Sequence, residues 1–335
     1  MLTFTLRRLL LAVPTLLFIS LVLFLVLDAA PGDPMSQIPL TIPPEVRAEM
    51  RAALGLGEPV YVRFALWLRQ FFWIEPLVLA DALLGTGLAD GQTRILSWQT
   101  RAPVMDTVAQ RLPQTLWVVG TAYLVGVAIA LPIGIIAAWR QHSVFDQAGT
   151  FVTMIGYSVP PFVTGPLVIA IFAVHLGWFP SVYDTTLFVT DWDSFTRQLR
   201  QMVLPVMVLA LQTTAMISRY MRAAMLDALP SDYVRTARAK GLPEHVVVLR
   251  HALRNAMIPV VTVIALGAPA IFGGAIVTET IFAVNGIGAQ LIDALNAGDL
   301  PTVQTLTFIF AVLIVLANLL ADILYAVLDP RIRYD

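Results

Sequence analysis

The chain has 335 residues, of which 58% are hydrophobic and only 13% are charged, and its formal net charge is −1. With a mean hydropathy of +0.79, this composition excludes an ordinary water-exposed surface and favours a protein embedded in a membrane. The absence of cysteine excludes disulfides, thiolate metal sites and cysteine-based catalysis.

Six uncharged runs are long enough to cross a bilayer, which takes about 18 residues or more. They cover residues 9–27, 112–139, 147–183, 201–218, 255–278 and 300–321. We therefore predict an all-α integral membrane protein with six transmembrane helices, the first of them in residues 1–30. The first run follows Arg7 and Arg8 as a signal peptide would, but five further spans and the lack of a small-residue cleavage site favour an uncleaved helix.

The segment 31–111 separates the first two runs and is predicted to be an extracytoplasmic insertion. Pro43–Pro44–Glu45 is typical of a helix start, and Gly55 of its end. A second stretch, 59–73, mixes aromatic and basic residues. Residues 76–100 show no clear period, and their structure stays open.

The second and third runs each carry a structural signal. Small residues recur every four positions in the second run, which lets two helices approach closely; they are Ala122, Gly126, Ala130, Gly134 and Ala138. The third run, 147–183, is too long for one straight span and too short for two spans with a turn. Its prolines, beginning with Pro160, predict one kinked helix that leaves the membrane near His175.

Charge is concentrated between the fourth and fifth runs. Segment 219–254 holds seven Lys and Arg residues, whereas segment 279–299 holds none and carries three acids. The positive-inside rule therefore places segment 219–254 and both termini in the cytoplasm. Asn318, Asp322 and Tyr325 share one face of the last span and predict a polar seam against a neighbouring helix or a partner subunit.

The charged segment reads as two short helices joined by a sharp turn. Ser231 is typical of an N-terminal cap and Gly241 of a stop, and Pro243–Glu244 begins the second helix. The apolar face predicted for this second helix consists of Leu242, Val246, Leu249 and Leu253. Such an element packs on its apolar side and shows its charges to water or to a partner. A loop that only satisfies the positive-inside rule is the alternative interpretation.

The residues YVRTARAKG at 233–241 and RHALRNAMIP at 250–259 strongly resemble the cytoplasmic loop of permease subunits of bacterial ABC importers, in the dipeptide/oligopeptide/nickel branch. The general family reads E-A-A-x-x-x-G here, and the matching positions are Arg235, Thr236, Ala237 and Gly241. Further similarities run along the chain at 110–116, 158–160, 279–282 and 286–288. The chain departs from the family at Val284–Asn285, where Trp-Pro is usual, and in a longer segment 74–91.

The resemblance implies a type I ABC importer permease fold, with a five-helix core at 112–335 and a cytoplasmic coupling loop at 219–257. The implied function is ATP-driven import of peptides or a similar small solute across the bacterial inner membrane by alternating access. The implied partners are a second homologous permease, one or two ABC ATPase subunits and an extracytoplasmic solute-binding protein, beside membrane lipid. The residues implied in docking the ATPase are Tyr233, Arg235, Thr236, Ala237, Arg238, Lys240, Gly241 and Leu242.

No catalytic role is predicted for this chain. Lys240 is its only lysine and lies between Ala239 and Gly241, so the Gly-Lys-Ser/Thr of a P-loop is absent. We expect no cofactor here, because ATP and Mg would be bound by the partner ATPase. His245 and His251 do not have the spacing of a metal site, and nucleic-acid binding is not expected of a segment tethered to the membrane at both ends.

Polar residues in spans three to five are the predicted lining of a transport pathway, namely Tyr157, Ser158, Gln212, Thr213 and Thr214. The alternative for the Ser and Thr residues is a hydrogen bond to their own helix backbone. Two other functions stay open at this point. One is a gradient-driven transporter or channel, which the scarcity of charges within the spans disfavours. The other is a membrane scaffold protein that uses the charged segment only for docking.

Overall fold

The computed structural model describes residues 2–29, 43–45, 57–85 and 87–328. The chain is helical through most of this part, and an isolated antiparallel bridge joins Leu96 to Pro103. The all-α class is confirmed. The helix predicted to begin near Pro44 and end at Gly55 lies almost entirely outside the described residues.

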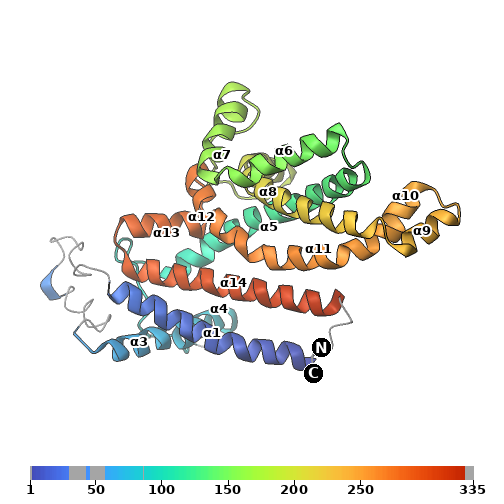
Figure 1. Cartoon of the computed structure of the whole chain (residues 1–335). Helices are drawn as coiled ribbons and strands as arrows, with labels where there is room; N and C mark the ends of the chain where they lie inside the picture. Colours follow the sequence, from blue (N-terminus) through green and yellow to red (C-terminus); the bar gives the residue numbers. More distant parts are fainter. Residues whose placement is uncertain (1, 30–42, 46–56, 86, 329–335) are drawn as a thin grey trace. The chain divides into compact units, whose positions relative to one another are not determined.

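Among the described residues, five helices are long and apolar enough to cross a membrane. They are α1 (Leu2–Asp28), α5 (Val104–Trp139), α8 (Trp192–Ala228), the helix at Glu244–Gly273 that contains α11 (Leu253–Gly267), and α14 (Leu300–Leu328) (Figure 1). Two bent helix pairs raise the number to as many as seven. The predicted six spans fall within this range.

The third run is broken more sharply than a kink. Helix α6 (Val144–Ser158) ends before Val159 and Pro160, both of which have extended backbone, and α7 (Pro161–Val168) begins immediately afterwards. The two halves meet at 109°, and the second half ends at His175, as predicted. Two consecutive extended residues stop the helix and restart it, whereas a single proline inside a helix only bends it.

The second bent pair joins α12 (Ile271–Phe282) to α13 (Ile287–Asn296) at 81°. Glu279 of α12 is 1% exposed, and its Oε2 accepts hydrogen bonds from the backbone N–H groups of Gly288 at 2.7 Å and Ala289 at 3.1 Å. These N–H groups belong to the first turn of α13 and have no partner within the helix. One buried carboxylate therefore caps α13 and fixes the bend.

The chain divides into two compact units. The first unit consists of Met1–Leu10, Gln114–Ala289 and Leu313–Asp335, and the second of Leu11–Pro113 and Gln290–Val312. The segment 31–111, predicted to be extracytoplasmic, belongs to the second unit.

The first unit is centred on α8, against which α6 and α11 pack. The small-residue stripe of α5 also contacts α8. A Cβ atom on Gly126 would lie 2.8 Å from the Cβ of Thr213, and one on Gly134 would lie 2.6 Å from the carbonyl oxygen of Ser218. Thr214 donates a hydrogen bond to the carbonyl of Gly126 at 3.1 Å. The helix-packing interpretation of the stripe is confirmed.

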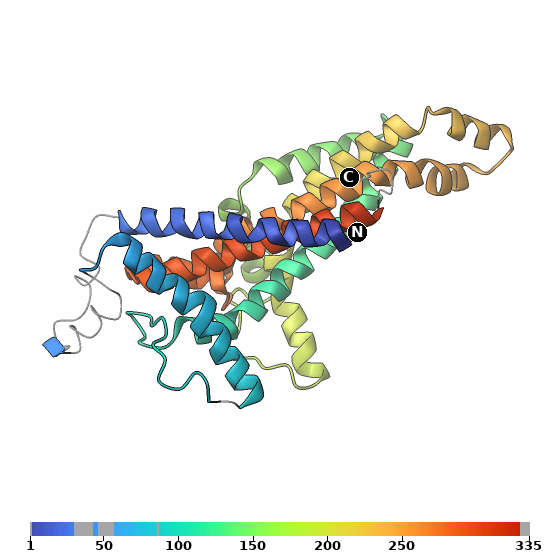
Figure 2. The ribbon, with the colours of Figure 1, turned by 90° about the horizontal axis from the view of Figure 1, so that it is seen from below.

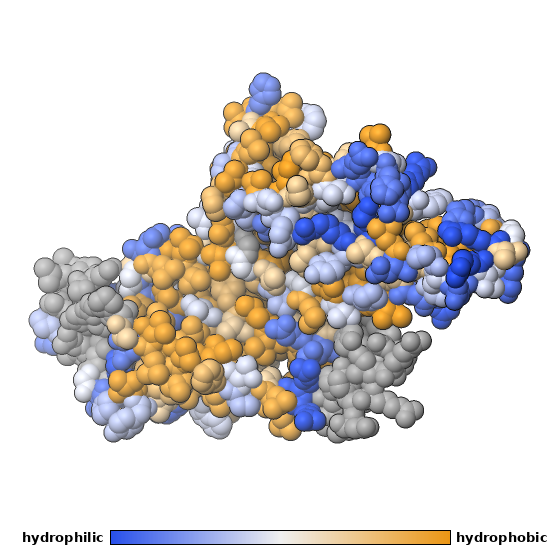
Figure 3. Space-filling view, in the orientation of Figure 1, coloured by the Kyte–Doolittle hydropathy of each residue, from blue (hydrophilic) through white to orange (hydrophobic). Residues whose placement is uncertain are grey.

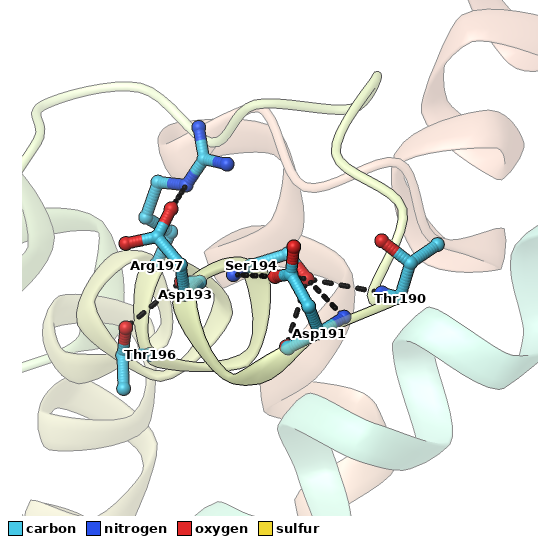
Figure 4. A network of polar contacts seen from close by, with 6 residues as sticks. All are labelled: Thr190, Asp191, Asp193, Ser194, Thr196 and Arg197. Carbon is cyan, nitrogen blue, oxygen red and sulfur yellow. Dashed lines mark hydrogen bonds and ion pairs between the residues drawn. The ribbon is translucent and has the colours of Figure 1, made fainter.

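Helix α8 begins with a capping box (Figure 4). The Asp191 carboxylate accepts the N–H of Ser194 at 2.7 Å, and the Ser194 hydroxyl accepts the N–H of Asp191 at 3.0 Å. The hydrogen bond from the Ser194 N–H favours the ionised carboxylate and holds the pKa of Asp191 below its usual value. The reciprocal pair fixes where the longest helix of the first unit starts.

Two ion pairs join helices of the first unit. Arg222 of α8 grips Asp146 of α6 with Nε at 2.6 Å and Nη2 at 2.8 Å, and the Asp146 side chain is 5% exposed. Arg8 of α1 lies 2.8 Å from Asp322 of α14. The second pair places Asp322 against a neighbouring helix, as predicted, whereas the side chain of Tyr325 lies outside the described residues.

The second unit contains a continuous helix that the open prediction for residues 76–100 missed in part. It runs through α3 (Val60–Arg69), the π-helical turn η1 (Gln70–Ile74) and α4 (Glu75–Leu84). In Figure 2 it starts near the end of α1 and runs obliquely away from it. Farther along the chain, the buried Asp299 accepts hydrogen bonds from the Ser97 hydroxyl at 2.5 Å and the Trp98 N–H at 3.0 Å. Asp299 thereby anchors the loop before α5 to the start of α14.

Candidate functional site

The charged segment forms a helical elbow, which we define as residues 231–252. Helix α9 (Asp232–Ala239) ends at a turn in which Gly241 has a φ of +75°, a left-handed conformation that glycine adopts without strain. The chain becomes helical again at Glu244, as α10 (Glu244–Val246) and the π-helical turn η3 (Val247–Ala252). Figures 1 and 2 show α9 and the turn projecting beyond the ends of α8 and α11.

The predicted bounds of the first helix are confirmed, but the prediction of a short second helix is wrong. From Glu244 the helix continues through η3 directly into α11, so the second arm of the elbow is the end of a membrane helix. Pro243 marks its start as predicted. Because no proline or glycine interrupts residues 244–258, nothing in the sequence stops the helix before the membrane.

The predicted apolar face of the second arm is confirmed only in part: Leu253 packs against the buried cluster of the elbow, but the most buried positions are others. Val247, Val248 and Ala252 are fully buried, whereas Leu249 is 53% exposed. The π-helical turn η3 inserts an extra residue into the helix and rotates the side chains that follow it. A face drawn with a regular period of 3.6 residues therefore misses the most buried positions.

Helix α9 packs on η3 through its buried side. Val234 is 0% exposed and Ala237 is 4% exposed, and both belong to one apolar cluster with Met225, Val247 and Val248. Ala237 is therefore small because α9 lies close to η3. The resemblance had implied that Ala237 docks the ATPase, but its side chain is buried inside the elbow and is not part of the exposed surface.

The other predicted docking residues are exposed on α9 and the turn that follows it. They are Tyr233, Arg235, Thr236, Arg238, Lys240, Gly241 and Leu242. Ser231 precedes α9, but its hydroxyl donates to the carbonyl of Ala228 instead of capping the helix. The exposed surface of the elbow thus combines an aromatic ring, three cations and an apolar tip.

Carboxylates within the elbow hold two of the cations in place. Arg238 bridges the two arms through Glu244, with Nη2 at 2.7 Å and Nε at 3.2 Å from the carboxylate oxygens. Hydrogen bonding to this carboxylate raises the pKa of Arg238. Arg235 pairs with Asp232 one turn earlier. Lys240 forms no ion pair with any residue in the described part of the chain, so its charge is available to a partner.

A cavity of about 330 Å³ lies within the first unit and brings together three of the five predicted pathway residues. Tyr157, Gln212 and Thr213 line it, together with Tyr123 of α5 and Met216 of α8. Ser158 is not among the lining residues. Thr214 instead binds the backbone of α5, as described above, and serves helix packing.

The guanidinium of Arg219 lies beside this cavity. Its central carbon is 4.4 Å from the centroid of the Tyr157 ring, a cation–π contact between α8 and α6. Gln212, Met216 and Arg219 follow one another at helical spacing along α8. The side of α8 that lines the cavity therefore leads to the exposed positive charge of Arg219.

Sequence reasoning missed Tyr123 and Met216. Tyr123 follows the small residue Ala122 and donates its hydroxyl proton to the carbonyl of Ile264, and a phenol within an apolar run was a usable signal. Met216 carries no such signal, because it is indistinguishable in pattern from a core residue. Among the described residues, no three His, Asp or Glu side chains gather as a metal site would require.

The helical fold is shared with membrane subunits of ABC transporters of known structure. An inward-facing structure of the MetNI methionine ABC transporter aligns with 67% of this chain and 97% of that chain, with a TM-score of 0.54 and 18% identity. A crystal structure of an amino acid ABC transporter with histidines covers 68% of this chain and 95% of its own, with a TM-score of 0.50 and 14% identity. These similarities show the fold.

Sequence comparison identifies the family. Residues 130–334 match the family described as binding-protein-dependent transport system inner membrane component, and residues 1–119 match the N-terminal part of such membrane components. The chain belongs to this family. The oligopeptide transport system permease protein AppB of Bacillus subtilis (strain 168) is 38% identical over 338 residues, covering the whole of both chains.

Two further relatives have similar lengths. The dipeptide transport system permease protein DppB of Alkalihalophilus pseudofirmus is 35% identical and covers 100% of both chains, and DppB of Escherichia coli (strain K12) is 36% identical and covers 100% and 99%. The chain is thus the permease subunit of an ATP-driven importer. A permease of this kind works with an ATPase and a binding protein.

Proposed function

We propose that this permease carries peptides across the bacterial inner membrane, in partnership with a second homologous permease. The observation that supports this substrate class is full-length similarity at 35–38% identity to proteins named as oligopeptide and dipeptide permeases. The charge distribution supports an orientation with the elbow and both termini in the cytoplasm.

The elbow is the part that we assign to the ATPase. Its exposed tyrosine and arginines are residue types enriched at protein interfaces. Its two arms are held rigid by the buried contacts of Val234 and Ala237 and by the Arg238–Glu244 pair. ATP and Mg would be bound by that ATPase, one or two copies of which dock on the assembled permeases.

Movement of the elbow can reach the cavity through one continuous element. The second arm and α11 form a single helix from Glu244 to Gly267, about 36 Å long at 1.5 Å per residue. Gly267 at its far end lines the cavity, and α11 packs against α8, which supplies Gln212 and Met216. In alternating access, a push on the elbow would therefore shift the walls of the cavity.

The cavity residues give one prediction. Gln212→Trp places an indole in the cavity of about 330 Å³. It is expected to lower peptide uptake about tenfold, which corresponds to an increase of about 1.4 kcal/mol in a rate-limiting barrier. Tyr220→Trp, two turns farther along α8 and 52% exposed, is the matched control and should leave uptake unchanged. Uptake is measured with labelled peptide in cells that contain equal amounts of each variant. Equal uptake by both variants would remove the cavity from the pathway.

The substrate class is tested by growth. An auxotroph that lacks this chain is expected not to grow on peptides as the source of its required amino acid, and to recover when the chain is supplied. Growth on the free amino acid is the control. Unimpaired growth on dipeptides and oligopeptides without the chain, in a strain with no other peptide importer, would contradict the proposal.

A further inference from the structure

The helix Val60–Leu84 of the second unit carries an exposed apolar face. Phe72, Leu79 and Leu83 follow one another along the helix at intervals of seven and four residues, and Trp73 and Leu84 flank them. Their exposed fractions run from 44% at Phe72 to 76% at Leu83. Water would meet this entire face if the helix belonged to a water-soluble insertion, and faces of this kind mark contact with a membrane or a partner.

The opposite side of the same helix packs on two membrane spans. The ring of Phe64 meets Phe24 of α1 with centroids 5.4 Å apart. Farther along, Trp67 and Phe71 meet Phe308 of α14 with centroids 5.3 and 4.8 Å apart. The helix is therefore attached to the two spans over its first half, from Phe64 to Phe72.

These contacts join the helix to two segments that are apolar enough to cross a membrane. Phe24 is four residues from the end of α1, and Phe308 is eight residues from the start of α14. At 1.5 Å per residue, the two rings lie about 6 Å and about 12 Å along the spans. One leaflet of the hydrocarbon core is about 15 Å thick, half of the roughly 30 Å core. Both rings thus lie within the thickness of one leaflet from the ends of these spans.

Three of the four charged side chains on this helix are paired or partly buried. The fourth, Arg69, is exposed one turn before Phe72 and Trp73, where the long apolar stem of an arginine lets its charge reach the headgroups. Glu75 is 7% exposed and is gripped by Arg94, with Nη2 at 2.8 Å and Nε at 3.2 Å from its oxygens. Arg63 pairs with Asp28 at the end of α1. Asp81 is partly buried and accepts the backbone N–H groups of Leu88 and Ala89. Pairing of this kind is what a charged group needs beside hydrocarbon.

We propose that the helix Val60–Leu84 is embedded in one leaflet of the bilayer, with its apolar face in contact with lipid acyl chains. The face continues the apolar surface of α1, where Phe18, Val22 and Val26 are exposed. Figure 3 shows hydrophobic side chains covering the side of the second unit on which α1 and α3 lie. With the orientation proposed above, this is the outer leaflet. The segment between the first two spans is then a membrane element in part, and its lipid contact is independent of the solute carried.

Spin labels test this assignment, because the chain has no native cysteine. Leu79→Cys and Leu83→Cys are labelled with a nitroxide in the transporter purified with its associated subunits and placed in lipid nanodiscs. Phe18→Cys on α1 is the lipid-facing control, and Asp90→Cys, exposed in the loop after α4, is the water-facing control. Collision rates with oxygen and with a water-soluble nickel chelate are measured for each label.

The expected result is a high oxygen rate and a low nickel rate at both test positions, equal to those at Phe18. A nickel rate as high as that at Asp90 would overturn the proposal in favour of a water-exposed helix. Low rates with both reagents would overturn it in favour of a protein partner that covers the face. Labels at solvent- or lipid-exposed positions disturb no internal packing, and elution as the assembled transporter checks the fold.

Discussion

Replacing Arg222 with leucine is expected to destabilise the permease by about 3 kcal/mol, the low end of the cost of breaking a buried ion pair. The substitution leaves the carboxylate of Asp146, which is 5% exposed, without its bidentate partner. The pair joins α6 to α8, so its loss also loosens the bent element that carries Tyr157. The lower end of the range applies because Arg222 itself is 29% exposed. Thermal unfolding in detergent measures the effect.

The matched control is the double variant Asp146→Asn with Arg222→Leu. It removes the uncompensated charge and should recover part of the stability lost by Arg222→Leu alone. If the double variant is as unstable as the sum of the two single variants, the contact does not act as an ion pair and its role in holding α6 is refuted.

Gly134→Leu is expected to cost roughly 3 kcal/mol, the upper end of what overpacking commonly costs. A Cβ atom at this position would already lie 2.6 Å from both the carbonyl oxygen of Ser218 and the Cβ of Met221. Because the nearest atoms belong to the backbone of α8 and the root of a buried side chain, rotation of a side chain cannot relieve the contact. Helices α5 and α8 must separate, and both contribute walls to the cavity.

Gly120→Leu is the control on the same helix. A Cβ atom at Gly120 has no neighbour within 4 Å, so this variant should match the unaltered protein in thermal stability and in uptake. Similar losses in the two glycine variants would mean that any large residue in α5 is harmful, and the close contact at Gly134 would not be the cause.

The sequence predicted those parts of the fold that depend on local pattern. Spans follow from uncharged length, the stripe of α5 from small residues every four positions, and the bounds of α9 from Gly241 and the residues before Asp232. The wrong predictions arose where regular periodicity fails. The π-helical turn η3 has no recognisable sequence signal and moved burial to Val247 and Val248.

Long-range pairing was the other limit. Asp146 and Arg222 are 76 positions apart, and a single sequence does not indicate which carboxylate an arginine meets. The same limit applies to the site: the motif marked the exposed elbow residues, but burial alone revealed that Ala237 serves internal packing. Met216 lines the cavity because of how α8 packs beside α5 and α11, and a single sequence does not reveal this packing.

The central claim is that the elbow couples this permease to its ATPase. Its most direct test is a disulfide crosslink from Ala239→Cys, an exposed position at the end of α9, to single cysteines on the co-purified ATPase, with and without ATP. Asp90→Cys in the second unit is the control that should not react. The account predicts a crosslink whose yield changes with ATP. No crosslink from Ala239→Cys to any position on the ATPase, in an assembled transporter that still hydrolyses ATP, would contradict it.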